Sequence, residues 1–303
     1  LSMVSFEEFK KVIKNEVIEA LPEEYLPCEW RFDTIKKSGY EYEALMISPD
    51  KSNGPTVIPA LNITDAYKQY TDGNDLDGIV EELVSIRISA TPNFGFNIED
   101  VIDFDKCKNR IIPRIVNTKN NSEYLRGKIC KHIQDLSILY SVVVSRDENG
   151  CAAAAITDEI ANAWGVSIDE IHNVAMANLE KEKPLFCDIT SMLFGGVKSI
   201  PIDNIDITKC NVPYFVLTSE YKSHGATMVL NHTIMKKITE AIGDVYIIPS
   251  SVDEVIIVPK NISDDIDGLN EMLREINAAD VKPEEQLSDN VYTWSVEDGL
   301  TIA

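Results

Sequence analysis

Two polar loops in the C-terminal third of this 303-residue chain contain side chains of the types that bind anions or catalyse reactions. The first loop, residues 218–225, contains hydroxyl groups, a lysine and His224. Because this loop leaves an expected strand ahead of an expected helix, its side chains can meet a small anion at the helix N-terminus. A polar hairpin or capping turn is the simpler interpretation of the same residues.

The second polar loop, residues 249–254, joins two strongly apolar runs. Its serine and aspartate side chains can equally close their own backbone as a turn, which is again the simpler interpretation. Strand-end loops of one domain can lie on a shared face, so any active site should bring the two loops together. The candidate cluster consists of His224, Ser250, Ser251, Asp253 and Glu254.

One stretch, from Lys106 to Lys131, is strongly basic, with eight Lys and Arg residues against the single acid Glu123. It predicts a local anion site, for which the candidate residues are Arg110, Arg114, Arg126 and Lys128. The alternative is a basic strip that pairs with acidic surface elsewhere on the molecule. The wide spacing of the cations, with isoleucines between them, favours this alternative.

The sequence lacks the motifs of common metal and cofactor enzymes. No two histidines stand four apart around a glutamate, and no Cys-x-x-Cys pair occurs. The Walker loop, the Gly-x-Gly-x-x-Gly fingerprint and the Gly-x-Ser-x-Gly elbow are also absent. We therefore expect no metal and no cofactor. The missing motifs favour a protein without enzymatic activity over an enzyme.

Residues 156–179 have the spacing of a helix-turn-helix. Ala161, Gly165 and Ile171 stand where that motif has its small residue, its turn glycine and its buried apolar residue, and Ser167 with Glu170 predicts a capping box. However, the segment carries four acids and no Lys or Arg, whereas a DNA-reading helix must neutralise phosphates. We interpret the motif as packing, and binding to duplex DNA is disfavoured.

Composition narrows the class of protein further. The length predicts about two domains, and 44% hydrophobic residues are enough for buried cores. Fifty acidic against 28 basic residues give a net charge of −22, which disfavours nucleic acid and anionic membranes as partners. The six cysteines are irregularly spaced, no apolar run approaches the ~20 residues of a membrane span, and no signal peptide is visible. We expect a cytoplasmic protein with reduced thiols, whose partner is another protein.

Hydrophobic periodicity predicts an N-terminal α+β domain over residues 1–135. A capping box of Ser5 and Glu8 begins a helix that Pro22 ends. A hairpin follows over residues 29–35 and 40–47, then a strand over 56–63 whose Pro59 indicates a sheet edge. Residues 65–70 and 76–88 read as helices.

A central segment, residues 136–212, and a C-terminal α+β domain, residues 213–303, complete the expected α+β fold. The central segment holds a β-hairpin (136–145 and 151–156), the helical pair, and an irregular connection from Pro184 onward. The C-terminal order is β-α-β-β-α-β, for which a ferredoxin-like sandwich is one arrangement. The first strand of this domain ends near residue 217, and the other three span 245–248, 254–258 and 291–294. The two helices span 228–242 and 264–278. We expect both helices on one sheet face, with Leu269, Met272, Leu273 and Ile276 turned inward.

Four segments resemble the family known as domain of unknown function 5688. They are Ser5 to Phe9, Ile138 to Val144, Ile247 to Ile256, and Leu287 to Tyr292. The likeness spans almost the whole chain. It implies a bacterial cytoplasmic protein, often associated with mobile elements, and it transfers no active site because its motifs are structural.

Two functions from different classes follow from the sequence. The first is a non-enzymatic interaction or regulatory protein that meets its partner through an acidic surface. The alternative is a small-molecule or nucleotide-modifying enzyme that uses the polar loops of the C-terminal domain. A pocket lined by converging polar groups would distinguish the second from the first.

Overall fold

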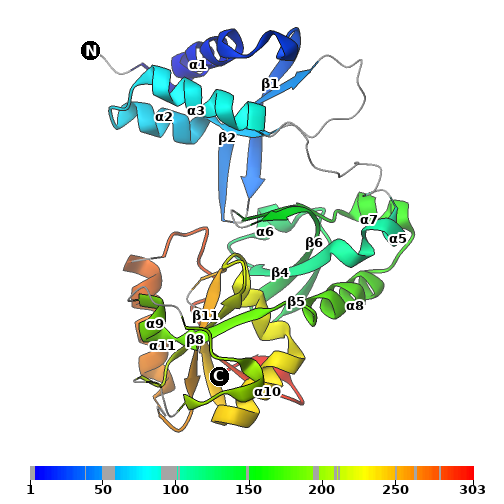
Figure 1. Cartoon of the computed structure of the whole chain (residues 1–303), viewed down its shortest axis with the longest axis vertical. Coiled ribbons are helices and arrows are strands. Elements are labelled where there is room, and N and C mark those ends of the chain that lie inside the picture. The colour runs from blue at the N-terminus through cyan, green and yellow to red at the C-terminus, as the bar shows by residue number, and fades with distance from the viewer. Residues whose placement is uncertain are drawn as a thin grey trace. The chain divides into compact units, whose positions relative to one another are not determined.

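The chain forms two compact units, residues 1–99 and 100–303. The computed structural model describes residues 4–37, 39–49, 59–89, 101, 103–147, 150–193, 198–207, 210, 212–249, 251–262, 265–279 and 281–303. The described residues form helices and three sheets (Figure 1), so the predicted α+β class is confirmed.

The domain boundary expected after residue 135 falls inside one sheet of the second unit. β4 (Ile111–Asn117) and β5 (Cys130–Ile133) both pair antiparallel with β6 (Leu136–Asp147). The expected boundary at 212 is also bridged, because β8 (Pro184–Asp188) pairs with β9 (Phe215–Ser219). Strand pairing therefore crosses both expected boundaries, within a single compact unit of residues 100–303.

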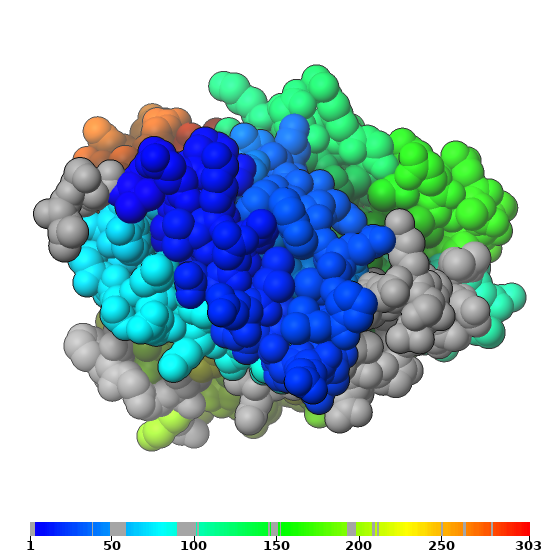
Figure 2. Space-filling model, turned by 90° about the horizontal axis from the view of Figure 1, so that it is seen from above, coloured from blue at the N-terminus to red at the C-terminus, as the bar shows by residue number. Residues whose placement is uncertain are grey.

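In its described residues, the first unit is a three-stranded antiparallel sheet with three α-helices and a short 3-10 helix, η1 (Glu23–Tyr25). Its elements are α1 (Phe6–Ala20), β1 (Cys28–Lys37), β2 (Tyr40–Pro49), β3 (Ala60–Asn62), α2 (Ile63–Thr71) and α3 (Leu76–Ser89). Helical spacing buries Phe9, Ile13 and Val17 of α1 against Leu45 and Ile47 of β2. In the space-filling view, α1 in dark blue lies against the lighter blue strands (Figure 2). The predicted first helix, hairpin and edge strand are confirmed, although residues 56–58 lie outside the described part.

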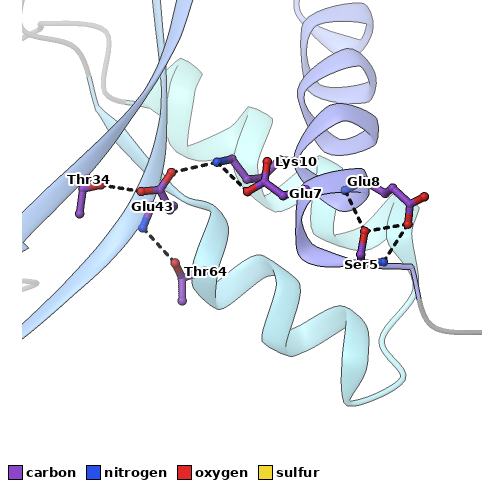
Figure 3. A network of polar contacts seen from close by, with 7 residues as sticks. All are labelled: Ser5, Glu7, Glu8, Lys10, Thr34, Glu43 and Thr64. Carbon is purple, nitrogen blue, oxygen red and sulfur yellow. Dashed lines mark hydrogen bonds and ion pairs between the residues drawn. The ribbon is translucent and has the colours of Figure 1, made fainter.

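Polar contacts tie α1 to the sheet (Figure 3). The Glu43 carboxylate accepts from the Lys10 ammonium over 3.0 Å and from the Thr34 hydroxyl over 2.6 Å. The Glu43 backbone N–H donates to the Thr64 hydroxyl over 2.9 Å. These bonds from Thr34 and Lys10 lower the pKa of Glu43, and the bond to Glu43 raises the pKa of Lys10. Glu43 thus joins two strands and two helices: its carboxylate contacts α1 and β1, and its backbone N–H contacts α2.

The helical pair α7–α8 packs against the first sheet of the second unit, and both contribute to one hydrophobic core. β7 (Gly150–Ala155) pairs with β6, and α7 (Asp158–Trp164) and α8 (Ile168–Leu179) follow it. Gly165 takes the left-handed conformation at the turn, with φ of 68°. Ile171 and Ala175 of α8 are fully buried. The packing interpretation of this motif agrees with that burial.

The second sheet of this unit has six strands in the order β13-β12-β10-β11-β9-β8. The remaining bounds are β10 (Val245–Ile248), β11 (Glu254–Pro259), β12 (Tyr292–Ser295), β13 (Gly299–Ile302), α10 (His232–Ile242) and α11 (Ile266–Ala279). The predicted hairpin of β10 and β11 is confirmed, with Ile247 opposite Ile257. However, β12 joins the sheet beside β10, whereas a ferredoxin-like sheet would place it beside β9.

This strand order puts α10 and α11 on opposite faces of the sheet, so the expectation of a shared face was wrong. Ile238 of α10 belongs to the core cluster that contains Ile247, whereas Leu273 of α11 belongs to the cluster that contains Ile248. Figure 1 shows the two helices on either side of β11. The connection from β9 to β10 and the connection from β11 to β12 both move toward the β13 edge of the sheet. However, β9 and β11, from which they start, are antiparallel. Right-handed connections must then use opposite faces.

Other short elements complete the second unit. β8 lies in the stretch that we expected to be irregular. The expectation arose because the strand is short and begins at a proline, which usually marks a loop. Met272, expected to point inward, is 39% exposed, whereas its neighbour Leu273 is fully buried. The short helices are α5 (Phe104–Cys107), η3 (Lys108–Arg110), α6 (Ser122–Leu125), α9 (Ile189–Leu193), η4 (Ile202–Asn204) and η6 (Gly225–Leu230).

Candidate functional site

A small cavity, the inner pocket, lies in the second unit where β4, the C-terminal end of α8 and the segment after β9 meet. Its volume is about 30 Å³, enough for a group of a few heavy atoms. Apolar residues form part of its wall: Ile112, Pro113, Leu179 and Met228. The polar lining consists of Arg114, Arg146, Cys151, Glu182, Ser219, Ser223, His224 and Thr227.

Arg114 is the most unusual group of this pocket. Its Nε and Nη2 atoms are buried and have no hydrogen-bond partner among the described residues. Burial lowers the pKa of Arg114, the expected direction for a cation moved out of water. The two atoms form one edge of the guanidinium, and this edge matches two oxygens of a carboxylate or phosphate. A buried, unpaired Arg edge is costly unless a ligand meets it.

Arg146 is the second cation of the inner pocket. It donates from Nη1 to the Glu182 carboxylate over 2.6 Å, and this partly buried pair fixes its position. A register shift between Val143 and Ser145 precedes it, and such a bulge redirects the following side chains. Arg146 lies directly across the ladder from Cys151, which lines the same pocket as Arg114.

His224 contributes a neutral imidazole to the pocket. Burial, with the nearby Arg114 cation, lowers the pKa of His224 to about 3. Its Nδ1 atom is buried and has no partner among the residues that the structure describes. The residue is held in the left-handed region, with φ of 50°, which is uncommon outside glycine. This conformation indicates that the surroundings fix the ring in place.

The two polar loops singled out in the sequence do lie against each other. The backbone N–H of His224 donates to Asp253 Oδ1 over 2.7 Å, and the Thr218 hydroxyl donates to the Asp253 carbonyl over 2.6 Å. The Ala226 N–H donates to the Val252 carbonyl over 3.2 Å. The loop after β9 is thereby fastened to the β10–β11 hairpin.

Only part of the expected polar cluster reaches the pocket. His224 lines the pocket. The Asp253 carboxylate instead accepts a hydrogen bond from the backbone N–H of His224, and the Ser251 hydroxyl accepts from the Asp253 N–H over 3.1 Å. Glu254 begins β11, and its pKa is raised by burial and by Asp253. Ser250 lies outside the described residues. The Ser251 and Asp253 side chains therefore act as turn-formers, in line with the simpler interpretation.

Of the four candidate cations of the basic stretch, two line cavities and two do not. Arg114 lines the inner pocket and Arg110 lines a neighbouring groove. Arg126 is exposed and pairs with Glu123 over 2.7 Å. Lys128 donates to the Tyr124 carbonyl and lies 4.1 Å from the centre of its ring. Neither Arg126 nor Lys128 lines the pocket or the groove.

The outer groove, as we call this neighbouring open cavity, has a volume of about 440 Å³. It shares Ile112, Arg146 and Glu182 with the inner pocket, so the two cavities meet at the Arg146–Glu182 ion pair. Its other lining residues are Asn109, Arg110, Val143, Asn178, Lys181, Lys183, Glu220 and Tyr221. The Arg146 guanidinium stacks 4.6 Å from the Tyr221 ring at this junction.

The pocket combines groups that serve several kinds of chemistry. Two guanidinium groups can bind an oxyanion, a thiol can act as a nucleophile, and a neutral imidazole can exchange a proton. The sequence reasoning missed Arg146, Cys151 and Glu182. They come from β6, β7 and the residues after α8, and only a tertiary arrangement brings them together.

Other kinds of site find less support. In the described ranges, no group of three or more His, Cys, Asp and Glu residues is arranged to hold a metal ion. No helix of the described residues is long and apolar enough to cross a membrane. All six cysteines are described and unpaired, in agreement with the expected free thiols. Burial raises the pKa of Cys107 and of Cys187 to about 11, which makes them poor nucleophiles.

Fold and site together define a two-unit α+β protein with a small buried pocket lined by arginines. The chain belongs to the family of unknown function DUF5688, whose model matches residues 6–295. No curated protein and no solved structure matches it. The family resemblance drawn from the sequence is thereby confirmed.

Proposed function

We propose that the second unit binds a small anionic molecule in the inner pocket. The observation that carries this proposal is Arg114, whose Nε and Nη2 edge is buried beside the cavity without a partner in the described structure. A buried cation without a carboxylate costs stability, so its presence indicates a role in binding. Of the two functions drawn from the sequence, the arrangement favours the small-molecule one.

We assign each group of lining residues a separate role in binding the anion. The Arg114 edge offers two parallel N–H donors to the two oxygens of an oxyanion. Arg146, anchored by Glu182, adds a second positive charge at the mouth of the pocket. Ser219 and Ser223 also line the pocket, where the Ser219 hydroxyl donates to the Ser223 carbonyl over 3.2 Å. Catalysis, if the ligand is a substrate, would draw on Cys151 and His224, the reactive side chains of the same lining.

Thermal unfolding and calorimetric titration of the full chain test the proposal. Acetate, sulfate and inorganic phosphate are each compared with chloride at equal ionic strength. At least one of these oxyanions should bind and raise the melting temperature. Arg114→Gln should abolish that binding while leaving the unliganded protein as stable or more stable, because a buried charge is removed. Arg126→Gln, which removes an exposed and paired arginine, is the matched control and should bind as the wild type does.

A second readout uses the pocket thiol. Bound anion should slow the alkylation of Cys151 by N-ethylmaleimide, while Cys28 in the first unit keeps its rate. Peptide mass spectrometry separates the two sites. If no oxyanion binds better than chloride, or if Arg114→Gln binds as well as wild type, the proposal is wrong.

A second candidate function is an interaction or regulatory role through a protein partner. The observation that favours it is the edge strand β1, whose Trp30 is 48% exposed and contacts the Phe32 ring at 6.0 Å. Exposed aromatics on a strand edge are common anchors for a partner. Cross-linking in the native cytoplasm should recover a protein that Trp30→Ser loses and that Val296→Ser, an exposed apolar control in the second unit, retains.

A further inference from the structure

We infer that the anion held by the inner pocket is the carboxylate of a small organic acid whose remaining atoms lie in the outer groove. This inference rests on the proposed function and names its ligand class. Three observations carry it: the charge of the inner pocket, its size, and the lining residues that it shares with the larger groove.

Charge balance favours a single negative charge. The ionisable lining of the inner pocket consists of Arg114, Arg146, Glu182, His224 and Cys151. With the Cys151 thiol counted as uncharged, two guanidinium cations and one carboxylate leave a net charge of one plus, since the imidazole is neutral above a pKa of about 3. A carboxylate neutralises this charge. A phosphate monoester, close to a dianion at neutral pH, would leave a buried excess negative charge.

The size and shape of the inner pocket also admit a carboxylate. A cavity of about 30 Å³ holds a group of carboxylate size. The Arg114 edge presents two donors in one plane, which is the geometry of a planar, bidentate carboxylate contact. The remainder of any larger ligand must leave the pocket.

The outer groove provides the space for that remainder. It adjoins the inner pocket at Arg146, and its volume of about 440 Å³ lies in the range of small-molecule sites. Most of its lining residues are of polar or charged types, among them Asn109, Lys183 and Tyr221. A polar metabolite-sized acid fits this lining better than a fatty acid does, because an acyl chain would have to desolvate charged side chains.

Calorimetric titration of the full chain at pH 8 tests the inference. The probes are acetate, succinate, glutamate, inorganic phosphate and methyl phosphate. Acetate should bind at least tenfold more tightly than either phosphate probe, and at least one larger acid should bind tenfold more tightly than acetate. Asn109→Trp, which adds bulk in the groove, should remove the advantage of the larger acid and leave acetate binding unchanged. Asn120→Trp, at an exposed turn outside both cavities, is the control.

The outcomes separate the two proposals. Binding of phosphate that equals or exceeds that of every carboxylate, and that depends on Arg114, would overturn the carboxylate inference and keep the anion site. Equal affinity for acetate and all larger acids, or no effect of Asn109→Trp on the tighter of them, would overturn the role of the groove. Absence of binding by all five probes would remove the proposed function itself.

Discussion

The backbone N–H of His224 donates to the carboxylate of Asp253 over 2.7 Å, although 29 residues separate them in the chain. This bond holds the loop that follows β9 against the β10–β11 hairpin and orients the imidazole at the inner pocket. Gly225, the next residue, lies so close to this hairpin and to the end of β9 that a Cβ atom there would be 2.6 Å from the Asp253 carbonyl oxygen and closer still to the Ser219 nitrogen.

Gly225→Ala should therefore destabilise the second unit severely, by about 3 kcal/mol or more, because backbone atoms rather than flexible side chains must move. Gly78→Ala is the matched control, since its Cβ would meet nothing within 4 Å inside helix α3. That substitution should be neutral or stabilise by up to about 1 kcal/mol. Chemical denaturation measures both, and a Gly225→Ala protein of wild-type stability would contradict the close approach.

His224 should make stability depend on pH. Burial and Arg114 lower the pKa of His224 to about 3 in the folded state, whereas the unfolded value is about 6.5. Between these values the unfolded chain binds the proton first, so stability falls as pH decreases from about 6.5 toward 3 and changes little above 6.5. The slope from this residue is about 1.4 kcal/mol per pH unit at most.

His224→Asn isolates this contribution, because asparagine tolerates the left-handed backbone and does not titrate. The difference in unfolding free energy between wild type and variant should shift in favour of the variant by roughly 2 kcal/mol between pH 6.5 and pH 4.5. A difference that is constant over this range would show that His224 is not held neutral in the fold.

The helices of the C-terminal part illustrate what the sequence determines. Periodicity predicted α11 and the burial of Leu273, because local spacing decides which stripe of a helix is apolar. It did not predict which sheet face α11 covers, because that depends on whether β12 pairs with β9 or with β10. Both arrangements have the same order of elements along the chain.

The same limit applies to the pocket. The basic stretch identified Arg114 as one of several cations, and the loop pattern identified His224. Nothing in the local sequence distinguishes buried Arg114 from exposed Arg126, since both stand near apolar residues. Arg146 depends on a bulge in β6 that no Gly or Pro marks, so its direction could not be derived from strand alternation.

Leu273→Ala should create a cavity and cost about 2 to 5 kcal/mol, because Leu273 is fully buried in the cluster between α11 and the sheet. Met272→Ala, one residue earlier and 39% exposed, should cost less than about 1 kcal/mol. Urea denaturation of both variants gives the comparison. Equal losses would mean that α11 does not present this face to the sheet.

The α7–α8 pair should not bind duplex DNA. The apolar side of α8 is used in the core through Ile171, Ala175 and Leu179. At its N-terminal turn, Asp169 pairs with Lys131 over 2.6 Å and Glu170 adds a further negative charge. A gel shift at low salt should show no complex at micromolar protein. Sub-micromolar binding that disappears on changing Asp169 and Glu170 to alanine would contradict this.

Asp135 should couple energetically to Tyr292. The Asp135 carboxylate accepts from the Tyr292 hydroxyl, from the Ser288 hydroxyl over 2.6 Å and from the Asn290 amide over 3.1 Å. Burial and the bond to Asp135 raise the pKa of Tyr292, so the hydroxyl remains a donor at all physiological pH values. These bonds tie the turn before β6 to the segment that leads into β12.

A double-mutant cycle with Asp135→Ala and Tyr292→Phe measures this coupling. Each single change should cost about 1 to 3 kcal/mol, because each leaves a mostly buried polar group with fewer partners. The two losses should fall short of additivity by about 1 kcal/mol or more. Asp298→Ala, at an exposed carboxylate that contacts Ser295, combined with Tyr292→Phe is the control and should be additive. Additive losses in the Asp135 cycle as well would show that the carboxylate and the phenol stabilise the unit independently, and the C-terminal strands would then depend on their ladder bonds and apolar contacts alone.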